Sequence, residues 1–299
     1  MTEAADSSYL GRLAARSVAT GTVLCLGLDP DPDALPDGFS RDLRGVEAFA
    51  RLVLDVAGPH AAAVKPNLAF FEAFGSAGIA ALERLRAAVA SDLPVVMDAK
   101  RGDIGSTAAR QAAALYDGLG ADAITVSPYL GGEAIAPLIG RSDRFAYVLC
   151  RTSNPGAGEL QGLVVAADPD LGAPDEPLWA RVARRAQRWG PGGTVGLVVG
   201  ATAAAELAAI RSLAPGLAFL IPGVGAQGGD EAAVLADGRA TANPVGSRPG
   251  GGLLVNVSRG IAGAAAAAGT PPGAMAPRDP AEALAAAAHD WAARLPVLP

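Results

Sequence analysis

Lysine is nearly absent from this sequence of 299 residues. Of its 24 cationic residues only two, Lys65 and Lys100, are lysines, and the formal net charge is −6 at pH 7. The arginines form no basic run, which argues against nucleic acid as a partner, because binding to a phosphate backbone requires a clustered positive surface. The two positions that keep lysine are candidates for chemistry, since lysine, unlike arginine, can give up its proton.

Cysteine and long apolar runs are also scarce. Cys25 and Cys150 lie in two separate apolar stretches, a pattern typical of buried thiols in a reduced protein. The N-terminal residues MTEAADSSYLGRLAARSVAT contain acids and no continuous apolar segment, so we expect no secretory signal. No stretch of about 18 residues is apolar enough to span a membrane. These absences predict a cytoplasmic protein with no membrane partner.

The sequence does contain a repeated alternation of short, β-branched apolar runs with longer alanine-rich helical stretches. Hydrophobic residues make up 51% of the chain, which is enough for a large core. The short runs are apolar on both faces, as expected of buried parallel strands. We predict strands at residues 22–29, 61–67, 94–100, 121–127, 145–153, 194–202, 218–225 and 252–260. Eight strands that alternate with helices predict an α/β fold, the (β/α)8 TIM barrel.

Four segments lie outside this alternation. We expect a helix before the first strand, an extended connection at 160–193 and a Gly/Pro-rich loop at 237–251. A closing helix is predicted at the C-terminus, with Asp279 as its N-cap and Pro280 at its first position. None of these segments resembles a second core, so we predict a single barrel domain over residues 1–299.

Charged residues follow the second and third predicted strands. Active sites of such barrels lie at the carboxyl ends of the strands. Asp98 and Lys100 share a face of the third strand because alternate residues point the same way, and Asp103 follows in the loop. With Lys65 on the adjacent strand, this Asp-x-Lys-x-x-Asp pattern predicts an array of ammonium and carboxylate groups that keep one another ionised. An ordinary strand-end salt bridge is the alternative interpretation.

Histidine is missing from this edge of the predicted barrel. His60 precedes the second strand and His289 lies in the closing helix. We therefore expect no metal cluster and no Ser–His pair at the site. Any acid–base chemistry must fall to lysine and aspartate.

The last two strands are followed by signals for an anion. Glycines at 223, 225, 228 and 229 follow the seventh strand, and Arg259 follows the eighth. Barrels of this class often bind phosphate at these two positions. Glycine lets backbone N–H groups approach the anion, and arginine offers a two-pronged donor. The sequence thus predicts a phosphate site opposite the charged array.

A series of motifs extends this interpretation. They are, in order, LGLDPDP, KPNLAFFEAFG, VVMDAKRGDIGST, SPYLG, RTSNPGAGELQ, PGVGAQGGD and NVSRGI, and they span about residues 20–261. In these motifs the sequence resembles the orotidine 5′-phosphate decarboxylase family, specifically its longer bacterial branch. The resemblance implies that orotidine 5′-monophosphate loses CO₂ to give UMP, a step of de novo pyrimidine biosynthesis, without metal or organic cofactor and with Lys100 as proton donor to the ring carbanion.

The resemblance also implies roles for individual residues. Lys65, Asp98, Lys100 and Asp103 match the family's charged tetrad, and Asp103 and Thr107 would enter the site of the neighbouring subunit of a homodimer. The implied substrate contacts are Asp29 with the ribose hydroxyls, Ser153 with the pyrimidine, Gln227 between base and phosphate, and Gly228 and Arg259 at the phosphate.

Two features depart from the family pattern, and two other functions remain open. Gly105 stands where shorter relatives have proline, and the 237–251 loop is longer than expected. One alternative is a sugar-phosphate lyase or decarboxylase of the same superfamily, which would bind Mg²⁺ through an acid where this chain has Lys65. The other is a catalytically silent barrel that binds a nucleotide, in which loss of a tetrad member would be expected.

Overall fold

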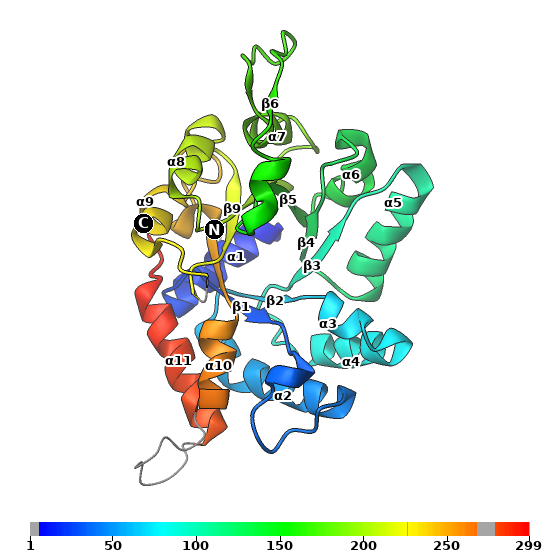
Figure 1. Cartoon of the computed structure of the whole chain (residues 1–299), viewed down its shortest axis with the longest axis vertical. Coiled ribbons are helices and arrows are strands. Elements are labelled where there is room, and N and C mark those ends of the chain that lie inside the picture. The colour runs from blue at the N-terminus through cyan, green and yellow to red at the C-terminus, as the bar shows by residue number, and fades with distance from the viewer. Residues whose placement is uncertain (1–5, 226, 268–278, 299) are drawn as a thin grey trace, which may run out of the picture.

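Eight parallel strands form a closed barrel in the computed structural model, which describes residues 6–225, 227–267 and 279–298 (Figure 1). The strands are β1 (Leu24–Leu28), β2 (Ala63–Pro66), β3 (Val96–Arg101), β4 (Ala123–Val126), β5 (Phe145–Arg151), β8 (Val195–Val199), β9 (Ala218–Pro222) and β10 (Leu254–Val257). Their order in the sheet is β2-β1-β10-β9-β8-β5-β4-β3. Isolated parallel bridges, Val64 with Val95 and Asn67 with Asp98, join the two ends of this order. The predicted (β/α)8 barrel is confirmed.

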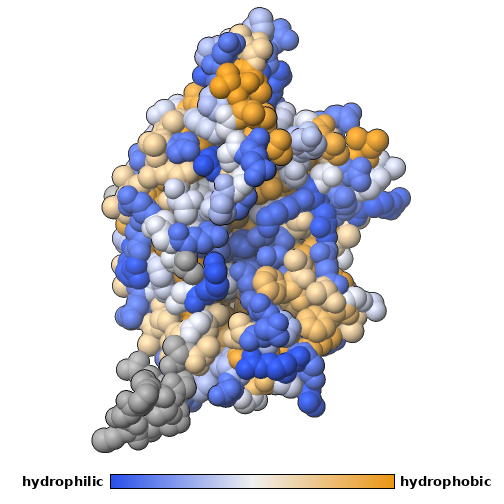
Figure 2. All heavy atoms as spheres, viewed as in Figure 1, coloured by the Kyte–Doolittle hydropathy of each residue, from blue (hydrophilic) through white to orange (hydrophobic). Residues whose placement is uncertain are grey.

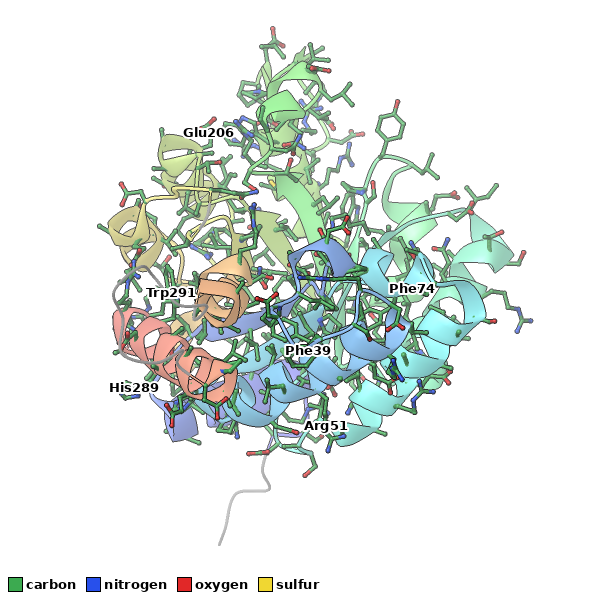
Figure 3. All side chains as sticks on the ribbon, turned by 60° about the horizontal axis from the view of Figure 1, so that its bottom comes forward. Phe39, Arg51, Phe74, Glu206, His289 and Trp291 are labelled. Carbon is green, nitrogen blue, oxygen red and sulfur yellow. The ribbon has the colours of Figure 1, made fainter. Side chains whose placement is uncertain are left out.

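Helices surround the barrel (Figure 1). They are α1 (Tyr9–Thr20), α2 (Leu43–Ala57), α3 (Ala69–Glu72), α4 (Gly75–Ala88), α5 (Gly105–Ala112), α6 (Gly132–Ile139), α7 (Leu178–Ala186), α8 (Ala204–Leu213), α9 (Glu231–Asp237), α10 (Arg259–Ala267) and α11 (Pro280–Arg294). α2 shows why they pack here, because it buries Val46, Phe49 and Val53 at helical spacing against the strands while Arg51 points outward (Figure 3). The main core therefore lies between the strands and the helices.

A second, smaller core fills the barrel interior at the amino ends of the strands. Its largest members are Tyr9 of α1 and Phe145 and Tyr147 of β5. The rings of Tyr9 and Phe145 stack with centroids 4.9 Å apart, and the hydroxyls of Tyr9 and Tyr147 are 3.1 Å apart. Helix α1 thus closes this end of the barrel, and the opposite end remains open for a site.

Both cysteines are buried and free, as predicted. Cys25 faces the barrel interior, where burial raises its pKa to about 12. Cys150 faces the outer core and donates its thiol to the carbonyl of Trp179 at 3.2 Å. Among the described helices, none is both long and apolar enough to cross a membrane.

The segment 160–193 is more structured than the extended connection predicted from its sequence. It contains an antiparallel pair, β6 (Val164–Val165) and β7 (Glu176–Pro177), followed by helix α7. The pair forms an arm that projects beyond the barrel at the top of Figure 1. Buried Glu176 accepts hydrogen bonds from Arg181 at 2.9 Å and Arg184 at 2.8 Å. These ion pairs attach the arm firmly to α7.

The 237–251 loop lies away from the open end. The loop follows α9, and Arg211 of α8 donates to the carbonyls of Asp237 and Gly238 at its start. Its last residues form a 3-10 turn (Pro249–Gly252) that packs on α1. The loop therefore lies at the closed end of the barrel. α11 begins as predicted, since the Asp279 carboxylate accepts from the N–H of Ala281 at 2.9 Å.

Candidate active site

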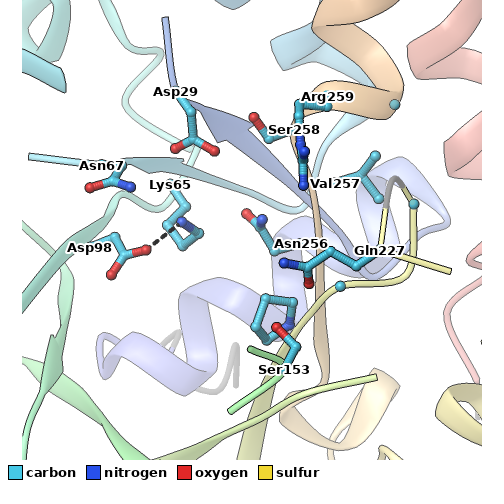
Figure 4. A pocket seen from close by; sticks show the side chains of 14 residues that line it. Asp29, Lys65, Asn67, Asp98, Ser153, Gln227, Asn256, Val257, Ser258 and Arg259 are labelled. Atoms are coloured by element: carbon cyan, nitrogen blue, oxygen red, sulfur yellow. Dashed lines mark hydrogen bonds and ion pairs between the residues drawn. The ribbon is translucent and has the colours of Figure 1, made fainter. Parts of the chain in front are cut away.

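Two lysines share one carboxylate at the open end of the barrel, and Figure 4 shows one of them, Lys65, beside Asp98. Lys65 of β2 donates from Nζ to Oδ2 of Asp98 at 2.8 Å, and Lys100 donates to Oδ1 of the same residue at 2.7 Å. The side chains of Lys65 and Asp98 are 5% and 12% exposed, whereas that of Lys100 is 51% exposed. The cluster thus has a buried part and one ammonium group that reaches the mouth.

Mutual charge keeps the buried pair ionised. Burial opposes the ionisation of Asp98, but the ammonium groups of Lys65 and Lys100 outweigh it and hold the pKa of this carboxyl below its usual range. Burial likewise acts to lower the pKa of Lys65, yet the carboxylates of Asp98 and Asp29 raise it above the ordinary value for lysine. The three charged groups thus hold one another in place through direct hydrogen bonds.

The backbone at Lys100 is unusual. Its φ of +48° makes it the only non-glycine residue with a positive φ in the described part of the chain. Such a conformation is costly for a side chain with a Cβ and persists only where the surroundings enforce it. The β3–β4 register shifts between Met97 and Arg101, so the strained residue lies in a bulge. Bulges of this kind re-aim side chains next to functional sites.

Two adjoining cavities meet at the charged cluster. One, of about 180 Å³, extends toward α10, and the other, of about 430 Å³, extends toward β5 and β8. Lys65, Asp98, Ser153 and Pro222 line both. Figure 2 shows hydrophilic residues around the hollow at the centre of this face. The mouth therefore has two compartments with the lysine–aspartate cluster at their junction.

The smaller cavity contains polar atoms without partners. Among the described residues, nothing hydrogen-bonds to the buried Oδ1 atoms of Asp29 and Asn256, and both residues line this cavity. Buried polar atoms are normally paired, so two unpaired ones in the same cavity indicate a place where a ligand or water completes the bonding. Arg259 adds a cation and Gly223, Gly225 and Gly260 expose backbone to the same space (Figure 4). This compartment is suited to a polar anion.

Most of the residues singled out from the sequence come together here. The smaller cavity is lined by Asp29, Lys65, Asp98, Ser153, Gln227 and Arg259, and the larger one adds Lys100. Gly228 lies in the adjoining turn, where its N–H donates to the carbonyl of Gly225, but it lines neither cavity.

Asp103 and Thr107 are separate from the cluster. Neither lines either of the two cavities of the site, and Asp103 accepts only the N–H of Ile104, at 2.8 Å, in the described part of the chain. Gly105, the first residue of α5, has a φ of +50°, a conformation that proline cannot adopt. Nor do the described residues contain a group of three or more His, Cys, Asp or Glu side chains placed to hold a metal.

Some polar lining residues, among them Thr125, Asn256 and Gln161, were missed by the sequence analysis. Thr125 contacts Asp98, Asn256 lies in the smaller cavity, and Gln161 lines the larger one, where it hydrogen-bonds to Thr152. Thr125 and Asn256 are polar residues inside otherwise apolar strands, which is the signal that could have found them. Gln161 lies in a loop and gave no comparable signal.

Comparisons with known proteins agree with this geometry. A family model described as the orotidine 5′-phosphate decarboxylase / HUMPS family matches residues 22–270. The chain belongs to this family. Among members named orotidine 5′-phosphate decarboxylase, the protein of Thermomicrobium roseum is 46% identical over 256 residues, or 85% of this chain and 86% of the relative. That of Halorubrum lacusprofundi is 48% identical over 259 residues, or 85% and 87%.

The fold of this decarboxylase / HUMPS family member is also matched by solved structures. The structure titled Leishmania donovani OMP decarboxylase superposes with a TM-score of 0.77 at 36% identity and covers 96% of each chain. The likeness therefore extends over nearly the whole length of both chains.

Proposed function

We infer that this protein decarboxylates orotidine 5′-monophosphate to UMP and CO₂. The observation that carries the inference is the shared Asp98 carboxylate, held between Lys65 and Lys100 beside a cavity whose other end is lined by Arg259 and glycine backbone. Family membership and relatives of that name at 46% and 48% identity support it. The reaction serves de novo pyrimidine biosynthesis, and we expect it in the cytoplasm.

Lys100 is the proposed proton donor. The bond between the ring carbon and the carboxylate breaks, the electron pair stays on the ring carbon, and CO₂ leaves. The Lys100 ammonium group stabilises this carbanion and then transfers a proton to it, which gives the new C–H bond. Because its side chain is half-exposed, Lys100 can regain a proton from solvent. Asp98, next to the departing carboxylate, also disfavours the ground state.

The remaining contacts follow the two compartments. Arg259 and the backbone around Gly228 bind the phosphate, Gln227 bridges phosphate and base, and Asp29 binds the ribose hydroxyls. Ser153, which lines both cavities, contacts the pyrimidine. Grip on the phosphate, remote from the reacting carbon, supplies binding energy that is realised in the transition state.

The position of Lys65 separates this function from a sugar-phosphate activity in the same family. A buried ammonium group at the end of β2 repels a divalent cation at the place where a metal-dependent relative needs an acid. A turnover assay with orotidine 5′-monophosphate, with and without chelator, tests the choice. UMP formation that resists chelator is expected; metal dependence would support the sugar-phosphate reading, and no turnover would support the silent nucleotide-binding barrel.

Lys100→Ala is expected to abolish product formation while leaving the fold intact, since the residue lies at the mouth and not in the core. Lys100→Arg should be nearly as inactive, because a guanidinium holds its proton too tightly to act as the acid. The measurements are steady-state kcat and thermal unfolding. Retention of more than a few per cent of wild-type kcat by Lys100→Ala contradicts the role of proton donor.

We also propose a homodimer with shared sites. In the described part of the chain, all the exposed large hydrophobic side chains except Val18 lie in the segments that follow β3, β4 and β5. These three strands are neighbours in the barrel, so the side chains lie on one side of its rim. They are Ile104, Tyr129, Leu130, Leu160, Leu163 and Val164. An apolar rim of this kind is typical of an interface. Asp103 and Thr107 lie on the same rim, apart from their own cluster, where a partner's site would receive them.

Mixing two inactive variants tests the shared site. Asp103→Asn and Lys100→Ala are each expected to be nearly inactive alone. After subunit exchange, half the dimers contain one chain of each kind, and one site of each such dimer is intact, so activity should recover to about a quarter of wild type. A mixture that stays inactive, with exchange confirmed by differently tagged subunits, would place Asp103 outside the partner's site.

A further inference from the structure

The bulge in β3 places three residues opposite one. Met97 pairs with Ile124 and Arg101 pairs with Val126, so Asp98, Ala99 and Lys100 all face Thr125. In a regular parallel ladder, alternate residues of β3 would donate their backbone N–H groups to carbonyls of β4. In the bulge, the N–H groups of two consecutive residues, Ala99 and Lys100, donate instead to a side chain of β4.

The side chain of Thr125 takes the place of the missing ladder. Its Oγ1 accepts hydrogen bonds from the N–H groups of Ala99 and Lys100, both at 3.0 Å. The same hydroxyl donates its proton to Oδ1 of Asp98 at 2.9 Å. A hydroxyl has one proton and two lone pairs, so its hydrogen-bonding capacity is fully used. Thr125 is only 2% exposed.

This saturation decides what Thr125 does at the site. It lines the larger cavity but has no donor or acceptor left for a ligand. Its three bonds all end on the residues that carry the charged cluster: the Asp98 carboxylate and the backbone on which Lys100 adopts its φ of +48°. The hydroxyl therefore acts on the lysine–aspartate pair and not on the substrate.

We propose that Thr125 is a positioning residue, whose hydroxyl holds the β3 bulge and thereby aims Lys100 and Asp98 at the reacting carbon. The catalytic part of this proposal, the aiming of Lys100 and Asp98, rests on the decarboxylation proposed above. The structural part, in which the Thr125 hydroxyl holds the bulge, does not depend on which substrate is bound.

Three variants test the role. Thr125→Val keeps the shape and removes the hydroxyl, and Thr125→Ser keeps the hydroxyl and removes the methyl group. Thr194→Val is the matched control, because Thr194 is also 2% exposed but its hydroxyl has no partner in the described part of the chain, and it lies before β8 at the closed end. Thermal unfolding of all three establishes that each is folded.

The expected signature is a split between kcat and KM. A displaced Lys100 lowers kcat of Thr125→Val by about 10–100-fold, while KM changes less than about 3-fold because the phosphate contacts are untouched. Thr125→Ser is expected to recover kcat to within about 3-fold of wild type, and Thr194→Val to leave it unchanged. A wild-type kcat in Thr125→Val, or a loss of the same size in folded Thr125→Ser, overturns the proposal.

Hydrogen exchange separates this test from the proposed reaction. The amides of Ala99 and Lys100 should exchange faster in Thr125→Val than in wild type or Thr194→Val, with or without substrate. If wild type does not decarboxylate orotidine 5′-monophosphate, the proposed function fails, and faster exchange still supports the hold on the bulge. Unchanged exchange overturns that hold.

Discussion

The two ends of the mouth are built in opposite ways. At the lysine–aspartate end, Asp98 is bonded by two ammonium groups and a hydroxyl, and the pair with Lys65 is buried. At the other end, Arg259 is exposed and forms no ion pair within the described residues, and Asn256 keeps a buried oxygen without a partner.

This difference teaches how the site divides its tasks. Groups that stabilise charge in a transition state are most effective when they are already fixed, because no reorganisation is then needed during the reaction. Groups that bind the substrate contribute the most binding free energy when the ligand itself completes their hydrogen bonds. Substitutions in the buried pair of the lysine–aspartate end should therefore cost both stability and catalysis, whereas those at the Arg259 end should weaken substrate binding and cost little stability.

Asp98→Ala should have the largest effect. It leaves Lys65 buried without its partner, which is expected to lower the free energy of unfolding by about 3–5 kcal/mol and to abolish turnover. Asp55→Ala is the control, because it removes an exposed ion pair with Arg51 on α2 and should cost only about 0.3–0.5 kcal/mol. Urea unfolding measures both. Equally small losses of unfolding free energy in both variants would mean that the buried pair stabilises the protein no more than an ion pair on the surface does.

The stability difference between wild type and the double variant Lys65→Ala/Asp98→Ala, in which neither charge of the buried pair remains, should depend on pH in a defined way. The pKa of Asp98 is lowered on folding, so its contribution is present above the unfolded pKa of about 3.9 and is lost as pH falls below it. The pKa of Lys65 is raised, so its contribution is present below about 10.4 and is lost as pH rises above it. Unfolding curves should show a plateau between these limits; a slope at neutral pH would contradict the ionised pair.

Arg259→Ala should have a smaller effect of a different kind. Loss of charge-assisted hydrogen bonds to the phosphate is expected to raise KM about 10–100-fold and to leave the free energy of unfolding unchanged. The control is Arg51→Ala, on the outer face of α2 (Figure 3). Initial-rate kinetics and urea unfolding report the two quantities. A marked loss of stability in Arg259→Ala would contradict the proposed difference, in which only the lysine–aspartate end contributes to folding stability.

The smallest predicted effect has the opposite sign. Asn256→Leu removes a buried oxygen without a partner, so the ligand-free protein should be more stable by about 1 kcal/mol while binding of UMP weakens. Thermal unfolding with and without UMP measures both changes. Destabilisation of the ligand-free protein would show that the Asn256 amide is already satisfied without a ligand.

The parts of the site that the sequence predicts are those set by local periodicity. Asp98 and Lys100 alternate on a strand whose apolar run is unmistakable, so their shared face follows directly. The bulge does not follow, because it depends on the register with Thr125 in another strand. The periodicity of a single strand therefore predicts which side chains lie together, but it does not predict the backbone conformation that orients them.

Long-range contacts account for the other misses. Helix α7 has the sequence LWARVARRA, and its arginines are explained only by Glu176 and Asp168 on the arm. Its short apolar stripe concealed the helix within a segment rich in proline and aspartate. The separation of Asp103 from the cluster likewise depends on the loop path after β3, which no periodicity encodes.

The closure of the barrel also constrains when the protein can fold during synthesis. β1 pairs through Leu24 with Val255, and Thr22 just before it donates its hydroxyl to the carbonyl of Leu295. The first strand to leave the ribosome thus obtains its second neighbour only when almost the whole chain has been made. Until then the nascent sheet presents open edges, which are prone to aggregation. Slow translation of the last strand and helix would prolong the period in which the chain depends on chaperones.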